Sequence, residues 1–191
     1  MRKVISLMHL SLDGFAAGPN GEMDWISYGE EEQNYVNSIL DTADTVLFGR
    51  TTYQMMENFW PTVPTHPVFS KSKYHIEHAR WINHTPKIVF SRSLERVEWM
   101  NTRLVRDDIA QEIAKMKQQP GKNIVMIGSP GLAHTLMQLD LIDEYRMNVN
   151  PVVIGSGIPF FKVDNKRIRL KLAEVNPFHS GVVGLAYQLA K

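Results

Sequence analysis

Residues 125–133 read Val125-Met126-Ile127-Gly128-Ser129-Pro130-Gly131-Leu132-Ala133, an apolar run followed by two glycines and the start of a helix. The glycines would let a ligand approach the backbone closely, and the helix N-terminus would supply free N–H groups and a positive dipole end. Pro130 suits the first turn of that helix, where its missing N–H costs nothing. A plain tight turn between a strand and a helix fits the same residues. Neither a Gly-x-Gly-x-x-Gly fingerprint nor a Walker loop is present, which argues against a Rossmann or P-loop protein.

In two other stretches, a predicted strand is followed by residues whose side chains and N–H groups could bind a phosphate. Leu47-Phe48-Gly49-Arg50-Thr51-Thr52-Tyr53 leads from a strand through a glycine into a helix that begins with an arginine and two threonines. Ser91-Arg92-Ser93 follows the strand predicted at residues 87–90, and such a serine and arginine could hold a 2′-phosphate. Taken singly, these stretches also fit an ordinary capped helix and a polar turn. Because ligands bind at the carboxyl ends of parallel strands, three such ends together predict a dinucleotide site.

The order of strands and helices along the chain predicts an α/β fold. Apolar runs rich in β-branched residues predict strands at residues 4–10, 45–48, 87–90, 123–127, 145–154, 168–175 and 182–189. Helical spacing predicts helices at residues 30–40, 51–59 and 108–116. This alternation indicates a central, mostly parallel sheet flanked by helices. After residue 141 no helix is predicted, so we expect antiparallel strands at the C-terminal edge of the sheet.

Two segments between these elements are predicted to be loops. Residues 11–25 contain three glycines and one proline with little periodicity, and a long ordered loop of this kind often covers an active site. Residues 61–67 contain three prolines, which predict a surface loop because proline denies N–H donors to a helix or sheet. His75 and His78 could share a helix face. With no third ligand evident, we interpret that face as a solvated helix surface rather than a zinc site.

Composition places the chain among globular proteins and excludes several classes. Its 191 residues fit one domain over residues 1–191, and 21 basic against 20 acidic residues give a formal net charge of +1. A balance this close to zero gives no reason to expect nucleic acid as a partner. The absence of cysteine excludes disulfides, thiolate zinc sites and cysteine nucleophiles, and we expect no metal. No apolar run is long enough to span a bilayer and no signal peptide is recognisable, so we expect no membrane association and a cytoplasmic location.

These motifs, in this order, resemble the dihydrofolate-reductase-like fold, and most closely the C-terminal reductase domain of the riboflavin-biosynthesis deaminase–reductase family. The matching stretches are Ser11-Leu12-Asp13-Gly14, Leu47-Phe48-Gly49-Arg50-Thr51-Thr52-Tyr53, Ile127-Gly128-Ser129-Pro130-Gly131, Leu141-Ile142-Asp143-Glu144 and Pro151-Val152-Val153-Ile154-Gly155-Ser156-Gly157. The zinc deaminase of that family needs cysteine ligands, which this chain lacks. The resemblance therefore implies a stand-alone reductase that acts on a small molecule. It also implies a homodimer joined through the late strands at residues 168–175 and 182–189.

The resemblance implies NADPH as the cofactor. In that family the glycine–arginine–threonine turn and the glycine-rich turn hold the cofactor phosphates, and the adenosine 2′-phosphate lies near the end of the strand at residues 87–90. The implied cofactor-binding residues are Gly49, Arg50, Thr51, Thr52, Ser91, Arg92, Gly128, Ser129, Gly131 and Leu132.

The resemblance leaves the substrate open between two classes. Trp25 and Glu30 repeat the spacing of a tryptophan and a carboxylate that contact the pterin in dihydrofolate reductases, which favours a pterin and makes Glu30 a catalytic candidate. The same Glu30 also fits a plain acidic first helical turn. Asp13 and Asp24 are alternative acids. Asp13 belongs to the riboflavin-type motif, which favours 5-amino-6-(5-phosphoribosylamino)uracil. A non-catalytic nucleotide-binding relative is a further alternative, and so is a small-ligand or flavin-binding relative that uses no nicotinamide. The implied substrate-binding residues are Asp13, Met23, Trp25, Gly155 and Gly157.

Overall fold

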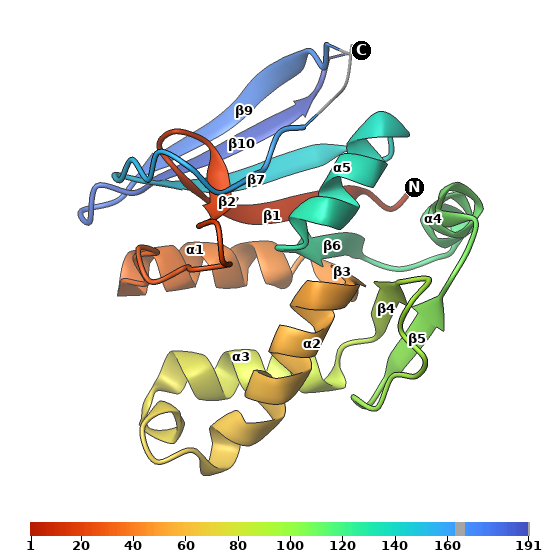
Figure 1. Ribbon diagram of the computed structural model, residues 1–191, viewed down its shortest axis with the longest axis horizontal. Helices are drawn as coiled ribbons and strands as arrows, with labels where there is room; N and C mark the ends of the chain where they lie inside the picture. The colour runs from red at the N-terminus through yellow and green to blue at the C-terminus, as the bar shows by residue number, and fades with distance from the viewer. Residues whose placement is uncertain (163–166, 191) are drawn as a thin grey trace.

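The computed structural model describes residues 1–162 and 167–190, and within them the chain forms a central eight-stranded sheet (Figure 1). The strands of this sheet are β1 (Val4–Ser11), β3 (Ala43–Gly49), β4 (Lys87–Phe90), β5 (Thr102–Val105), β6 (Asn123–Ile127), β7 (Glu144–Asn150), β9 (Leu170–Pro177) and β10 (Val183–Leu189). They lie in the order β5-β4-β3-β6-β1-β7-β10-β9. A second, two-stranded sheet pairs β2 (Phe15–Ala17) with β8 (Ile158–Pro159).

The sheet is parallel from β5 to β7 and antiparallel beyond it. β1 lies between β6 and β7 and is parallel to both, and β3 and β4 continue the parallel part toward β5. β10 is antiparallel to both of its neighbours, β7 and β9. The predicted fold class, a mostly parallel sheet with antiparallel strands at the C-terminal edge, is therefore confirmed. The strand predicted at residues 145–154 ends earlier, at Asn150, where Pro151 follows.

Helices cover both faces of the sheet. They are α1 (Glu30–Leu40), α2 (Arg50–Phe59), α3 (Lys73–His84), α4 (Ile109–Gln118) and α5 (Pro130–Gln138). Val4 and Met8 of β1 join a core with α4 and α5, whereas Ile5 and Leu7 join a second core with α1, α2 and α3. In Figure 1, α5 and α1 accordingly lie on opposite sides of β1. Because both faces of the central strands are buried, these strands read as continuous apolar runs. None of the helices in the described part of the chain is long and apolar enough to cross a bilayer.

The proline-rich segment at residues 61–67 is more regular than predicted. A 3₁₀ helix covers Trp60–Thr65, and a second one, Phe69–Lys71, leads into α3. Pro61 occupies the first turn, where its missing N–H has no partner to lose. Trp60 and Val63 are buried. The segment lies at the surface as predicted, since most of residues 61–67 are exposed, but the prediction of a loop is wrong because a 3₁₀ helix forms there and buries Val63.

Candidate functional site

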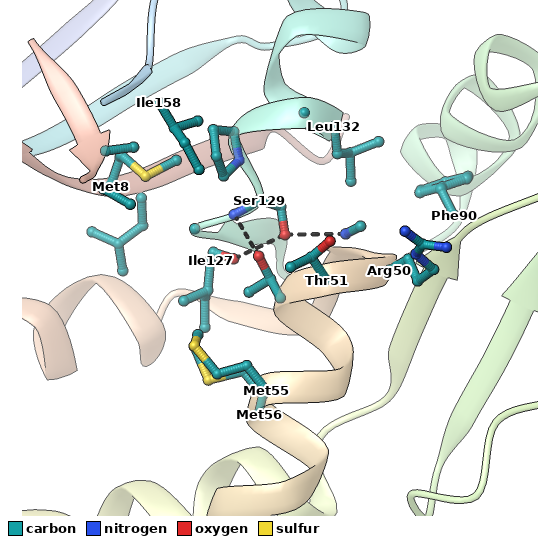
Figure 2. Close-up of a pocket in the computed structure, with 18 of the residues that line it drawn as sticks. Met8, Arg50, Thr51, Met55, Met56, Phe90, Ile127, Ser129, Leu132 and Ile158 are labelled. Atoms are coloured by element: carbon teal, nitrogen blue, oxygen red, sulfur yellow. Dashed lines mark hydrogen bonds between the residues drawn. The ribbon is translucent and has the colours of Figure 1, made fainter. Parts of the chain in front are cut away.

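The glycine turns after β3 and β6 lie side by side and are joined by Ser129. Because β3 and β6 are parallel neighbours, Gly49 and Gly128 reach the same edge of the sheet. The Oγ of Ser129 accepts a hydrogen bond from the Gly49 N–H at 3.0 Å, and the Ser129 N–H donates to Thr52 Oγ1 at 3.1 Å (Figure 2). Ser129 is buried, so these bonds are shielded from water. They fix the starts of α2 and α5 relative to one another.

The backbone after β6 leaves the start of α5 open. Gly128 and Ser129 both have a positive φ, 57° and 61°. A Cβ added at Gly131, the second residue of α5, would meet no heavy atom within 4 Å. The first N–H groups of a helix have no acceptor inside the helix, and the dipole adds positive potential at the same place. The start of α5 can therefore bind an anion.

A cleft of about 1370 Å³ runs along this edge of the sheet. All ten residues predicted to hold the cofactor line this cleft, and so does Met23. Figure 2 shows Arg50 and Phe90 on one side of Ser129 and Met8 and Ile158 on the other. The joined glycine turns thus lie between two ends of the cleft, and different kinds of side chain line these two ends.

Three arginines, Arg50, Arg92 and Arg106, line one part of the cleft, which we call the cationic end. Arg50 donates from Nη1 to Ser93 Oγ at 2.9 Å. Arg106 donates to the main-chain oxygens of Arg92 at 3.3 Å and Glu95 at 2.8 Å, so its position is fixed by the backbone. Guanidinium groups suit phosphate oxygens. Sequence reasoning missed Arg106, which directly follows β5, because a strand of four residues is too short for its periodicity to stand out.

The part of the cleft at the far end of α2 is lined by rings, and we call it the aromatic chamber; it is formed by Tyr28, Phe59, Trp60, Phe69, Tyr74 and His78. Arg50 and Phe59 are the first and last residues of α2, which separates the chamber from the cationic end. The rings of Trp60 and His78 lie 4.2 Å apart. His78 is only 6% exposed, so the prediction of a solvated helix surface is wrong for this residue. The 3₁₀ helix of residues 60–65 covers that face of α3, and no periodicity of α3 itself could reveal this.

Two imidazoles of the cleft, those of His9 and His78, have no hydrogen-bond partner among the described residues, and the Nδ1 atom of each is buried. Burial lowers the pKa of both rings to about 4, so both are neutral at neutral pH. A neutral imidazole presents one donor and one acceptor. In the part of the chain that the structure describes, no group of three or more histidine or carboxylate side chains is arranged to hold a metal ion.

Acid should destabilise the protein through His78. Because its folded pKa of about 4 lies below the ordinary 6.5, the unfolded chain binds more protons between these values, and stability falls as the pH drops through this window. At about pH 5 the expected loss for this ring is about 2 kcal/mol. Between neutral pH and pH 5, the free energy of unfolding should fall by about 2 kcal/mol less in His78→Phe than in the wild type, as measured by urea unfolding. His84→Phe changes an exposed ring of the same helix and should behave like the wild type. An equal acid sensitivity of His78→Phe and the wild type would contradict this account.

Comparison with known proteins places the chain in a family. The family model described as the RibD C-terminal domain matches residues 2–184. The chain belongs to this family. It is 33% identical over 186 residues to the uncharacterized protein YyaP of Bacillus subtilis (strain 168), with 97% of this chain and 94% of that protein covered.

Solved structures share the fold. A protein of Shewanella sp. PV-4, described as a riboflavin biosynthesis protein, superposes with a TM-score of 0.78 at 19% identity, covering 99% of both chains. The diaminohydroxyphosphoribosylaminopyrimidine deaminase/5-amino-6-(5-phosphoribosylamino)uracil reductase of Thermotoga maritima gives a TM-score of 0.68 at 16% identity, covering 99% of this chain and 57% of that one. The resemblance to the riboflavin-type reductase domain and its dihydrofolate-reductase-like fold is therefore confirmed.

Five predicted residues lie outside the described lining of the cleft: Asp13, Trp25, Glu30, Gly155 and Gly157. Glu30 is the exposed first residue of α1, so in this arrangement its carboxylate faces solvent and favours the helix dipole. Trp25 is half-buried, and its Nε1 is buried without a partner among the described residues. The pair on which a pterin site was predicted is therefore not brought into the cleft.

Asp13 connects the loop after β1 to the segment before β8. Its carboxylate accepts hydrogen bonds from the N–H groups of Ile154 at 3.3 Å and Gly155 at 2.8 Å. A hydrogen bond from Ser11 and these amides lower the pKa of Asp13. A Cβ at Gly157 would lie 2.2 Å from the main-chain oxygen of Ala17, so glycine is needed there for β8 to approach β2. The structure thus brings Asp13, Gly155 and Gly157 together as an anchor for this loop.

Proposed function

We propose that this protein is an NADPH-dependent reductase that transfers hydride to a small heterocyclic substrate. The observation that supports it best is the junction at Ser129, where the glycine turns of two neighbouring parallel strands and the start of α5 meet in one cleft. Membership in the RibD C-terminal domain family, a reductase family that typically uses a nicotinamide cofactor, supports the same activity.

The cleft suits a dinucleotide in backbone geometry, charge and size. The start of α5, open at Gly131, would receive the pyrophosphate, and Arg50 lies at the start of α2 beside it. Arg92 and Arg106 would hold the 2′-phosphate at the cationic end. The volume of about 1370 Å³ exceeds the roughly 300–1,000 Å³ of ordinary ligand pockets, which leaves room for a second molecule. NADPH bound there would supply the hydride.

The protein's own groups would position the two molecules and keep water away from them. The loop of residues 11–25 is anchored through Asp13 and contributes Met23 to the lining. Enclosure of this kind is a general function of active-site loops. A pterin substrate would depend on Trp25 and Glu30, which lie outside the described lining, so we do not propose it.

Arg50→Ala should weaken NADPH binding by about tenfold to a hundredfold, because a hydrogen bond to a charged group contributes about 1.5–3 kcal/mol. Arg50 is exposed and bonds only Ser93 Oγ among the described side chains, so its removal should leave the fold unchanged. The measurement is the dissociation constant from a calorimetric or fluorescence titration. Arg96→Ala removes an exposed arginine outside the cleft and should bind NADPH as the wild type does. Equal affinities for Arg50→Ala and Arg96→Ala would show that Arg50 does not contact the cofactor.

We also propose that the protein forms a homodimer through β9. In the described part of the chain, β9 lies at the edge of the sheet and pairs with β10 on one side. It exposes Leu172 and Val175, each 48% accessible. An uncovered strand edge with apolar side chains can pair with a second copy. Sedimentation at micromolar concentration measures the mass of the assembly.

A further inference from the structure

Formal charge is distributed unevenly along the cleft. Among the described lining residues, the charged ones are Arg50, Arg92, Arg106, Asp107 and Asp108, and they stand at the start of α2, after β4 and before α4. No lysine, arginine, aspartate or glutamate of the described residues belongs to the lining at the aromatic chamber. A phosphate or carboxylate placed in the chamber would therefore lose its water without gaining a cation, which is strongly unfavourable.

The histidines do not supply the missing positive charge. Three histidines line the cleft: His9, His75 and His78. His9 and His78 are neutral at neutral pH, because burial lowers the pKa of each to about 4. Burial also lowers the pKa of His75, whose ring contacts Phe59, Trp60 and Phe69, below its ordinary value. The chamber is thus uncharged under the conditions in which the enzyme would work.

The walls of the chamber suit a flat ring. Trp60 packs against His78 with ring centres 4.2 Å apart, and Phe59 packs against Phe69 at 5.0 Å, so these rings form a continuous wall. The sides of this wall that line the cleft offer contact to an aromatic plane. The thioether of Met55 adds an adaptable apolar contact from α2. Figure 2 shows Met55 and Met56 further along α2 than Arg50 and Thr51.

The imidazoles that line the cleft indicate which groups the ring should carry. The Nδ1 atoms of His9 and His78 are buried without a partner among the described residues, and a buried polar atom left unpaired costs about 1–3 kcal/mol. His78 is itself more than nine-tenths buried. These Nδ1 atoms have almost no accessible surface, so a ligand in the cleft would pair with the other ring nitrogen, Nε2, of each neutral imidazole. A ring nitrogen or carbonyl group can make that hydrogen bond, whereas a plain hydrocarbon cannot.

We propose that the aromatic chamber is the substrate subsite and that it takes an uncharged, planar nitrogen heteroaromatic molecule that carries no phosphate group. The claim that the chamber binds the substrate rests on the proposed reductase function. The claim that the chamber selects uncharged rings rests only on the residues that line it. A substrate without phosphate would differ from the one named for the Thermotoga maritima relative, which includes a phosphoribosyl group.

Riboflavin and FMN test the proposal, because they share one planar heteroaromatic ring system and differ by one phosphate. We expect the full-length protein to bind riboflavin about tenfold or more tightly than FMN, measured by equilibrium dialysis with and without saturating NADP⁺. NADP⁺ occupies the cationic end in our account, so it prevents the FMN phosphate from binding there. Binding of FMN as tightly as riboflavin with NADP⁺ present, or binding of neither compound, would overturn the proposal.

A cation placed on α2 at the edge of the chamber, one helical turn before Phe59, should change this selectivity. Met55 lines the cleft and is 41% exposed, so Met55→Arg should fold, and we expect it to raise the affinity for FMN relative to riboflavin by about tenfold. Met55→Gln has a similar length without the charge and should keep the wild-type preference. An unchanged preference in Met55→Arg would contradict the chamber assignment.

A separate NADPH titration of the same protein distinguishes the two proposals. If the protein binds riboflavin selectively but does not bind NADPH, the proposed reductase function is refuted and the proposed selectivity of the chamber is supported. If the protein binds NADPH and prefers FMN to riboflavin, the proposed reductase function is supported and the proposed selectivity of the chamber is refuted.

Discussion

Gly131→Asp should weaken NADPH binding by about a hundredfold or more while the protein stays folded. Gly131 is the second residue of α5, and a Cβ there meets no heavy atom within 4 Å, so the new side chain enters the cleft without a clash. Its carboxylate would stand where we propose the cofactor phosphates. Like charges in contact cost several kcal/mol, which corresponds to about a hundredfold or more in affinity. The same carboxylate lies in the first turn of a helix, where it interacts favourably with the dipole, so stability should not fall.

Two matched variants separate charge from shape at this position. Gly131→Asn has nearly the same volume as aspartate without the charge, and Gly131→Ala adds a single carbon. We expect NADPH affinity to fall in the order wild type, alanine, asparagine, aspartate, with the largest step at the charge. Titration by calorimetry gives the affinities, and thermal unfolding reports the fold. If Gly131→Asp bound NADPH as well as Gly131→Asn, the phosphate site would lie elsewhere.

Lys87→Met should destabilise the protein by about 3 kcal/mol or more. Lys87 is fully buried on β4, and its ammonium donates to the main-chain oxygens of Ile82 at 2.8 Å, Asn83 at 3.2 Å and Thr85 at 2.8 Å. It also lies 4.6 Å from the centre of the Trp99 ring. Methionine would fill the space and leave these carbonyls without this donor, and each unsatisfied buried group costs about 1–3 kcal/mol. Because the carbonyls belong to the end of α3 and the residue after it, the helix that carries His78 should loosen as well.

The free energy of unfolding from urea titrations measures the effect of Lys87→Met. The control is Lys73→Met, at the exposed start of α3, where the expected change is within about 0.5 kcal/mol. Hydrogen exchange of α3 amides should be faster in Lys87→Met and unchanged in Lys73→Met. A Lys87→Met protein as stable as the control would mean that the ammonium does not stabilise the end of α3.

The sequence predicts the sheet well, and it brings the ten residues proposed to hold the cofactor to one cleft, because both depend on local patterns. Strands buried on both faces are continuous apolar runs, and the helix predicted at residues 30–40 has the observed bounds of α1. The glycine turns after β3 and β6 could be placed on one edge, because parallel strands bring their carboxyl ends together.

The aromatic chamber could not be predicted in this way. Its rings come from the segment before α1, from the end of α2, from a 3₁₀ helix and from α3, and tertiary packing alone brings these together. The prolines of residues 61–67 argued for a surface loop, which concealed the helix that buries His78. Lys87 begins the apolar run of residues 87–90, and nothing in the sequence marks its ammonium as the donor for three carbonyls.

Titration of the wild-type protein with NADPH and with NADH tests the central claim most directly. We expect one saturable site per chain, with NADPH bound about tenfold or more tightly than NADH, because the 2′-phosphate would gain charged hydrogen bonds from Arg92 and Arg106. Absence of saturable binding of NADPH up to about 1 mM, which corresponds to about 4 kcal/mol of binding free energy, would contradict the account.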